Sequence, residues 1–209
     1  MTIVNMIDTI AEWVRTEVCG EIKLKKEPKL DAMNMASYRY ELVHPKVWVL
    51  YRPTPDTLTL YEYDCPCIVI QPLKIEYDHA SGNITDAVIR LCCVTWSPGE
   101  HMPDNYELDD AQLPPGRLGI YRQSGGESFR PDDEGWRDAY NLSDLILGKL
   151  FHTESIGSLK ISKEHEIEAS PFTEERVLQY FYPEYFMRVD IHFFTQEPPV
   201  KNRTVTELL

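Results

Sequence analysis

Two long runs rich in β-branched and aromatic residues constrain the fold more than any other feature of the sequence. They span Cys67–Asp78 and Ile84–Trp96, and a short segment that contains Gly82 and Asn83 joins them. Glycine and asparagine tolerate the positive φ angles of tight turns, so the pattern predicts a long β-hairpin. Pro72 interrupts the first run. Because proline cannot donate to a strand ladder, we expect that strand to lie at a sheet edge or to carry a bulge there.

A first helix is predicted at the N-terminus, where apolar residues recur at three- and four-residue steps. Thr2 or Asn5 can cap it, it runs to about Val18, and Gly20 ends it. The apolar residues of its predicted buried face are Ile3, Met6, Ile7, Ile10, Trp13 and Val14.

A second helix is predicted after residue 134. Asp132, Asp133 and Glu134 suit the positive end of its dipole, whereas Lys149 and His152 suit the negative end. Its predicted apolar stripe consists of Ala139, Leu142, Leu145, Ile146 and Leu150.

Four further strands are predicted outside the hairpin. Val47–Tyr51 is a β-branched and aromatic run that two prolines close, and Ser158–Ser162 and Ile167–Ala169 are short. Glu184–Gln196 alternates two sets of side chains and is expected to be a half-buried antiparallel strand. One expected face carries Tyr185, Met187, Val189, Ile191 and Phe193, and the other Phe186, Arg188, Asp190, His192 and Phe194.

These elements predict an α+β fold, in which a mainly antiparallel sheet with a long β-hairpin packs against two main helices on one face. The 209 residues are enough for a sizeable core, and we expect a single domain over 1–209. Irregular insertions are expected near 21–44 and 97–134, with brief pairing at Leu118–Tyr121 in the second.

Charge and hydropathy exclude several classes of partner. The formal net charge is −13, which repels phosphate backbones, so we expect no direct nucleic-acid binding. The apolar runs are too short to cross a bilayer, and Met1–Val18 lacks the pattern of a signal peptide, which favours a cytosolic protein without membrane contact.

The five cysteines do not indicate a disulfide framework. Cys65 and Cys67 lack the two-residue spacer of redox and zinc motifs, and the adjacent Cys92 and Cys93 should point to opposite faces of a strand. We expect them to be buried free thiols.

A search for catalytic chemistry gives little. No glycine-rich segment has the pattern of a phosphate cradle, and no two of the six histidines have the spacing that aims both rings at one metal. His165–Glu168 is the nearest candidate, against the simpler interpretation of a solvated strand end. We therefore expect no enzymatic activity, cofactor or metal.

The proline- and glycine-rich segment 97–134 carries many carboxylates. Three interpretations stay open: a solvated acidic loop, a surface that meets a partner protein, or a cation site at Asp104, Asp109 and Asp110. If the segment meets a partner, the candidate interface residues are Asp104, Glu107, Asp109, Asp110, Arg117, Arg130, Asp132 and Asp133.

Three stretches resemble the tail-terminator (tail-completion) proteins of long-tailed bacteriophages and prophages, as does the order of the predicted elements. They are the proline-ended hairpin from Pro66–Pro72 to Val94–Trp96, the helix start Gly135–Leu142, and Tyr182–Phe186 leading into the last strand. About two thirds of the chain fits this resemblance.

The resemblance implies a subunit that forms a ring, commonly a hexamer, on the head-proximal end of a tail tube. Such a ring would stop tube growth and offer a surface to the head connector, in a virion tail assembled in the bacterial cytoplasm. The alternatives are another neck or tail-assembly protein of such phages, a small metal-dependent hydrolase or nuclease using the acidic loop, and a monomeric adaptor domain.

Overall fold

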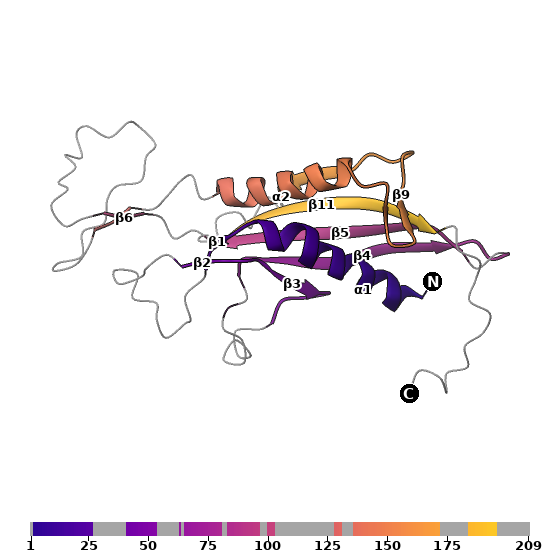
Figure 1. Cartoon of the computed structure of the whole chain (residues 1–209), viewed down its shortest axis with the longest axis horizontal. Coiled ribbons are helices and arrows are strands. Elements are labelled where there is room, and N and C mark those ends of the chain that lie inside the picture. The colour runs from indigo at the N-terminus through magenta and orange to yellow at the C-terminus, as the bar shows by residue number, and fades with distance from the viewer. Residues whose placement is uncertain are drawn as a thin grey trace, which may run out of the picture.

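The described part of the chain comprises residues 2–26, 41–53, 63, 65–80, 83–96, 100–102, 128–130, 136–171 and 184–195 of a computed structural model. Within it, two helices lie on one face of a mainly antiparallel sheet (Figure 1). The α+β fold, the long hairpin and the placement of both helices on one face are as the sequence predicted.

The main sheet has seven strands among the described residues, in the order β3-β4-β5-β11-β9-β8, and β10 pairs with β11 beside β9. β3 runs parallel to β4, and the other pairs are antiparallel. The strands are β3 (Lys46–Val49), β4 (Cys67–Tyr77), β5 (Ile84–Trp96), β8 (Ser155–Ile156), β9 (Leu159–Ile161), β10 (Glu168–Pro171) and β11 (Glu184–Thr195).

The β4–β5 hairpin carries the irregularity that Pro72 predicted. Its register shifts between Pro72 and Lys74, as in a β-bulge. β3 covers the outer edge of β4 through the pair Val49 and Ile70, so Pro72 lies where no described strand pairs with that edge. A residue without a backbone N–H therefore costs the ladder no hydrogen bond on that side.

The N-terminal helix begins where the sequence predicted. α1 (Ile3–Trp13) is capped by Thr2, whose hydroxyl accepts a hydrogen bond from the Asn5 N–H at 3.2 Å. The helix continues through a wider π-helical turn, η1 (Val14–Val18), into a 3₁₀ turn, η2 (Cys19–Glu21), which contains Gly20.

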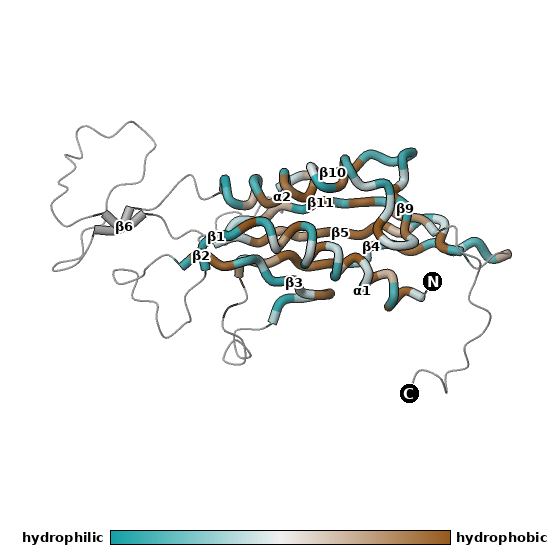
Figure 2. The backbone as a smooth tube through the Cα atoms, viewed as in Figure 1, coloured by the Kyte–Doolittle hydropathy of each residue, from teal (hydrophilic) through white to brown (hydrophobic). Residues whose placement is uncertain are grey.

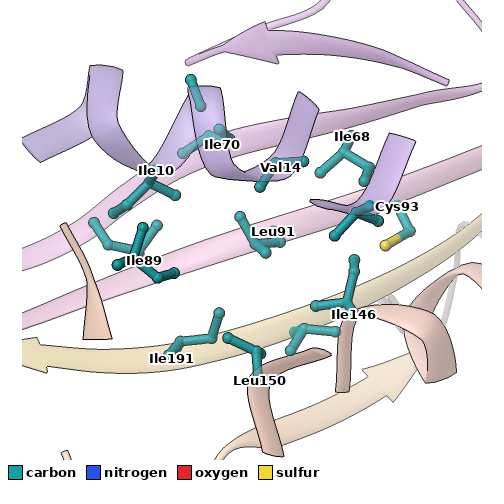
Figure 3. Packing of buried hydrophobic residues seen from close by; sticks show 14 of the residues in the cluster. Ile10, Val14, Ile68, Ile70, Ile89, Leu91, Cys93, Ile146, Leu150 and Ile191 are labelled. Carbon is teal, nitrogen blue, oxygen red and sulfur yellow. The ribbon is translucent and has the colours of Figure 1, made fainter. Parts of the chain in front are cut away.

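The second helix, α2 (Trp136–Phe151), contacts β5 and β11, and α1 contacts β3 and β4. Between helices and sheet lies the main core, whose packing Figure 3 shows. Ile10, Val14, Ile146 and Leu150 approach the sheet from the helix layer, and their partners in the figure are Ile68, Ile70, Ile89, Leu91, Cys93 and Ile191. The apolar stretches of β4 and β5 stand out along the chain in Figure 2.

Two short ladders lie outside the main sheet. β1 (Leu24–Lys25) pairs with β2 (Leu42–Val43), and β6 (Glu100–Met102) pairs with β7 (Ser128–Arg130), both antiparallel. Each ladder therefore joins the two ends of one of the expected insertions. The expected pairing at Leu118–Tyr121 lies outside the described residues. No helix in the described ranges is both long and apolar enough to span a membrane.

Candidate functional site

The face of the sheet opposite the helices carries an apolar cluster of its own, which we call the second-face cluster. Alternation along β5 and β11 sends every other side chain to this face, which is why Cys92 lies here whereas Cys93 lies in the main core. Its buried members are Cys65, Cys67, Val69, Val94 and Trp96, and Trp48, Cys92 and Phe186 are partly exposed at its margin.

Ion pairs continue along the same face. Arg90 on β5 and Asp190 on β11 are directly opposite each other, and the guanidinium donates two hydrogen bonds of 2.8 Å to the carboxylate. Further along β11, Arg188 donates to Ser170 and Glu168 of β10. Paired charges of this kind keep half-buried polar groups satisfied on an otherwise apolar surface.

A third pair connects distant strands. Arg52, which follows β3, donates two hydrogen bonds of 2.9 and 2.8 Å to Glu184 at the start of β11. Because β4 and β5 separate β3 from β11 in the sheet, this pair connects the segment after β3 to a strand that is not its neighbour. Burial opposes its charge, but the hydrogen bonds and the negative charge of Glu184 outweigh burial and raise the pKa of Arg52.

Leu50 directs the chain away from β3 toward this face. Its φ angle is 71°, in the left-handed region that bulky residues rarely adopt. The Leu50 N–H donates to the carbonyl of Ile70, and its own carbonyl accepts from the Gln71 side chain. These bonds fix the point at which the chain leaves the sheet.

Exposed apolar side chains occur on the second half of β4 and on the two residues that directly follow β3, its edge neighbour. We call this set the β4 edge patch. Its members and their exposed fractions are Leu50 (50%), Tyr51 (73%), Leu73 (47%) and Tyr77 (45%). Single exposed apolar residues are ordinary, but several along one strand edge indicate a contact surface. Pro72, Lys74 and the bulge disfavour pairing with a further strand, so this patch favours contact through side chains.

A polar cluster lies toward the other end of the second face. His192 of β11 donates from Nδ1 to the Asp86 carboxylate of β5 at 2.8 Å. The His192 ring stacks on that of His165, which lies between β9 and β10, with ring centroids 4.1 Å apart and planes 6° apart. His165 Nδ1 in turn lies 3.0 Å from the Ser162 hydroxyl.

A groove of about 480 Å³ opens beside this cluster. Ser162 and His165 form part of its wall, together with charged side chains of both signs, including Lys160 and Glu154, and the ring of Phe194. The groove gives solvent and small ions access to His165, whose side chain is exposed.

The two histidines of this cluster were missed by the argument from sequence spacing. They lie far apart in the chain and meet because β9 and β10 both pair with β11, a tertiary relation that no local spacing encodes. The alternation predicted for β11 did place His192 opposite the core. His165 also belonged to the stretch that the sequence singled out, although for a different site.

The candidate interface residues of the acidic loop mostly lie outside the described residues. This applies to Asp104, Glu107, Asp109, Asp110, Arg117, Asp132 and Asp133. Arg130 lies in β7, where its backbone pairs opposite Glu100. The expectation for this set stays a prediction.

The cysteines are free thiols, and four of the five are buried, as predicted. Burial raises the pKa of Cys92 and Cys93, and that of Cys19 to about 12. Such thiols are poor nucleophiles near neutral pH.

The fold and these surfaces define a two-layer α+β protein with a partly apolar second sheet face, an exposed apolar strand edge and a compact histidine–aspartate cluster. A comparison with known protein families, curated proteins and solved structures gives no match to this chain.

Proposed function

We propose that this chain is a structural subunit that assembles into a closed ring and caps the head-proximal end of a phage tail tube. Its partners are further copies of itself, commonly five to complete a hexamer, then the tube protein below and the head connector above. The role requires no catalytic residue. The subunit is made in the bacterial cytoplasm and ends in the virion tail.

The β4 edge patch is the observation that carries this proposal. In a ring, one surface of each subunit contacts a different surface of its neighbour. Such heterologous contacts form a closed ring when the rotation between neighbours closes, and an open filament when it does not. An exposed apolar strand edge suits one of these surfaces, since burying apolar area is the main favourable term in association. In this proposal the occupant of the patch is a second copy of this chain.

The order of elements gives a second, weaker support. Helix, strand, long hairpin, helix, short strands and last strand follow one another in the order on which the resemblance to tail terminators rests. The ladders β1–β2 and β6–β7 are additional, and three short strands rather than a pair lie between α2 and β11. The net charge of −13 makes the subunits repel one another. Assembly would then depend on contacts or cations that offset this repulsion.

Negative-stain microscopy of the purified chain, with and without millimolar magnesium, tests the proposal. We expect closed rings with a central hole, more abundant when magnesium screens the carboxylates. Open filaments, or single particles in every condition, would contradict ring formation and favour a monomeric adaptor domain.

A further inference from the structure

The Asp86, His165 and His192 side chains form a cluster that a purely structural role does not explain. The hydrogen bond from His192 to Asp86 satisfies both groups at 2.8 Å. It gives no reason for a second imidazole to lie against the first with nearly parallel rings. A neutral imidazole offers one ring-nitrogen lone pair, and that lone pair is what ligates a metal ion.

The donor atoms of these three residues are close enough to share an ion. One ligand atom from each, a carboxylate oxygen and two ring nitrogens, can be chosen so that all lie within 4.8 Å of one another. In a tetrahedral zinc site such atoms are roughly 3.3 Å apart, given metal–ligand distances of about 2.0–2.2 Å. The remaining difference is small enough for a side-chain rotation to close.

The cluster combines a fixed part with an adjustable part. Asp86 and His192 are partly buried and project from the neighbouring strands β5 and β11. His165 is exposed on the segment after β9, where the Ser162 hydroxyl contacts its Nδ1 and also accepts from the Glu164 N–H at 3.3 Å. Stacked rings cannot both direct lone pairs at one ion, so binding requires His165 to turn out of the stack, and the adjoining groove leaves space for this.

The surrounding charges permit a cation. The Lys74 ammonium lies 4.0 Å from the Asp86 carboxylate, but it pairs more closely with Glu76, at 2.7 Å. Two imidazoles and one carboxylate suit zinc and its neighbours in the transition series, whereas magnesium and calcium prefer oxygen ligands.

We propose that Asp86, His165 and His192 bind one divalent transition-metal ion of the zinc class, with a remaining position open to water. The ion takes the place of the proton between His192 and Asp86, and it joins the segment after β9 to the two central strands β5 and β11. None of the three residues belongs to the β4 edge patch, although Asp86 lies opposite Glu76 of β4.

Calorimetric titration of the tag-free, metal-stripped chain with zinc chloride tests the site. We expect one zinc ion per chain, and binding at least tenfold weaker in each of Asp86→Asn, His165→Gln and His192→Gln. His79→Gln and His152→Gln remove exposed histidines outside the cluster and should bind zinc as the unchanged chain does.

Cobalt absorption and thermal unfolding distinguish the loss of a metal ligand from the loss of the fold. Cobalt should give the visible bands of a low-coordinate nitrogen and oxygen site in the unchanged chain and lose them in His165→Gln, whose exposed position leaves the core intact. Zinc, but not magnesium, should raise the Tm of the unchanged chain alone. Absence of stoichiometric zinc binding, or binding that both His165→Gln and His192→Gln leave unaltered, would overturn the proposal.

Discussion

Gly157, in the turn between β8 and β9, has a left-handed backbone conformation and lies close to α1. Residues with a side chain tolerate both poorly. Its φ angle is 59°, and a Cβ atom there would lie 2.9 Å from the Thr9 methyl group of α1. The Thr9 hydroxyl donates to the Asn5 carbonyl, which holds that methyl group in place. The turn can therefore approach α1 only because it lacks a side chain.

Replacing Gly157 by alanine should lower the free energy of unfolding by about 1–3 kcal/mol, from left-handed strain and the contact with Thr9. Gly148 in α2 is the matched control, since a Cβ there meets nothing within 4 Å. Gly148→Ala should raise stability by about 0.5–1 kcal/mol, because alanine favours helix interiors. Equilibrium denaturant unfolding measures both, and equal effects of the two substitutions would contradict the account.

Cys19 makes stability depend on alkaline pH. Burial raises the pKa of its thiol from 9.0 to about 12, against the smaller opposing effect of Arg15. Above about pH 9 the unfolded chain releases this proton while the folded chain retains it. Below pH 9 the Cys19 thiol therefore does not change the free energy of unfolding. Between pH 9 and 12 it lowers the free energy of unfolding by about 1.4 kcal/mol per pH unit.

Cys19→Ala should make this alkaline decline less steep by the contribution of one proton, about 1.4 kcal/mol per pH unit. Denaturant unfolding between pH 8 and 11 measures the slope. Val18→Ala serves as control, because it removes buried apolar atoms without a titrating group and should lower stability by a similar amount at every pH. An unchanged slope in Cys19→Ala would show that its thiol titrates equally in both states.

At the scale of elements, the pair Arg52–Glu184 connects β3 to β11 across the second face. Glu184→Gln should lower the free energy of unfolding by about 1–3 kcal/mol, because it removes the negative charge from a half-buried bidentate pair. Glu12→Gln is the control, since its pair with Arg15 is exposed and 3.5 Å long. That change should stay within about 0.5 kcal/mol.

A double-mutant cycle with Arg52→Met separates the pair from other effects of each substitution. We expect a coupling free energy of about 1–2 kcal/mol between positions 52 and 184 in urea unfolding. Coupling near zero would mean that the pair does not hold β3 against the rest of the sheet.

Elements with a strong internal period could be predicted from the sequence, and elements defined by distant contacts could not. A regular spacing of apolar residues marks α1, α2, the β4–β5 hairpin and β11 in the sequence. Their type and approximate bounds therefore followed from the pattern alone. The ladders β1–β2 and β6–β7 are two or three residues long and have no measurable period. The parallel pairing of β3 with β4 depends on how the connecting chain crosses the sheet, which side-chain alternation does not encode.

The same distinction applies to the candidate site. The sequence correctly separated Cys92 from Cys93 and the two faces of β11, because adjacent strand residues point in opposite directions. It did not bring His165 to His192, since that contact requires the strand order of the finished sheet. The β4 edge patch was missed for a similar reason: its members are ordinary in the sequence, and only the point at which β3 ends places them beside a strand edge that no other described strand pairs with.

In the whole molecule, the helix layer and the sheet layer leave surfaces of different chemistry. The helices close the main core on one face, and in the described part of the chain the second face and the β4 edge carry the surfaces that the proposals use. The metal site proposed at Asp86, His165 and His192 lies on that second face, and Asp86 is the cross-strand neighbour of Glu76, next to Tyr77 of the β4 edge patch. Substitutions of His165 and His192, which β5 separates from β4, disturb metal binding without changing the β4 edge.

We propose above that the chain assembles with copies of itself through the β4 edge patch, and its mass in solution tests this. Light scattering across a range of concentrations, with and without magnesium, should give the mass of a closed multiple of the 24.3 kDa chain. The double variant Leu73→Glu, Tyr77→Glu should shift that mass to a monomer, whereas Phe151→Glu, at a 77% exposed position on the end of α2, should leave it unchanged. A monomer at every concentration, or a double variant that assembles like the unchanged chain, would contradict the account.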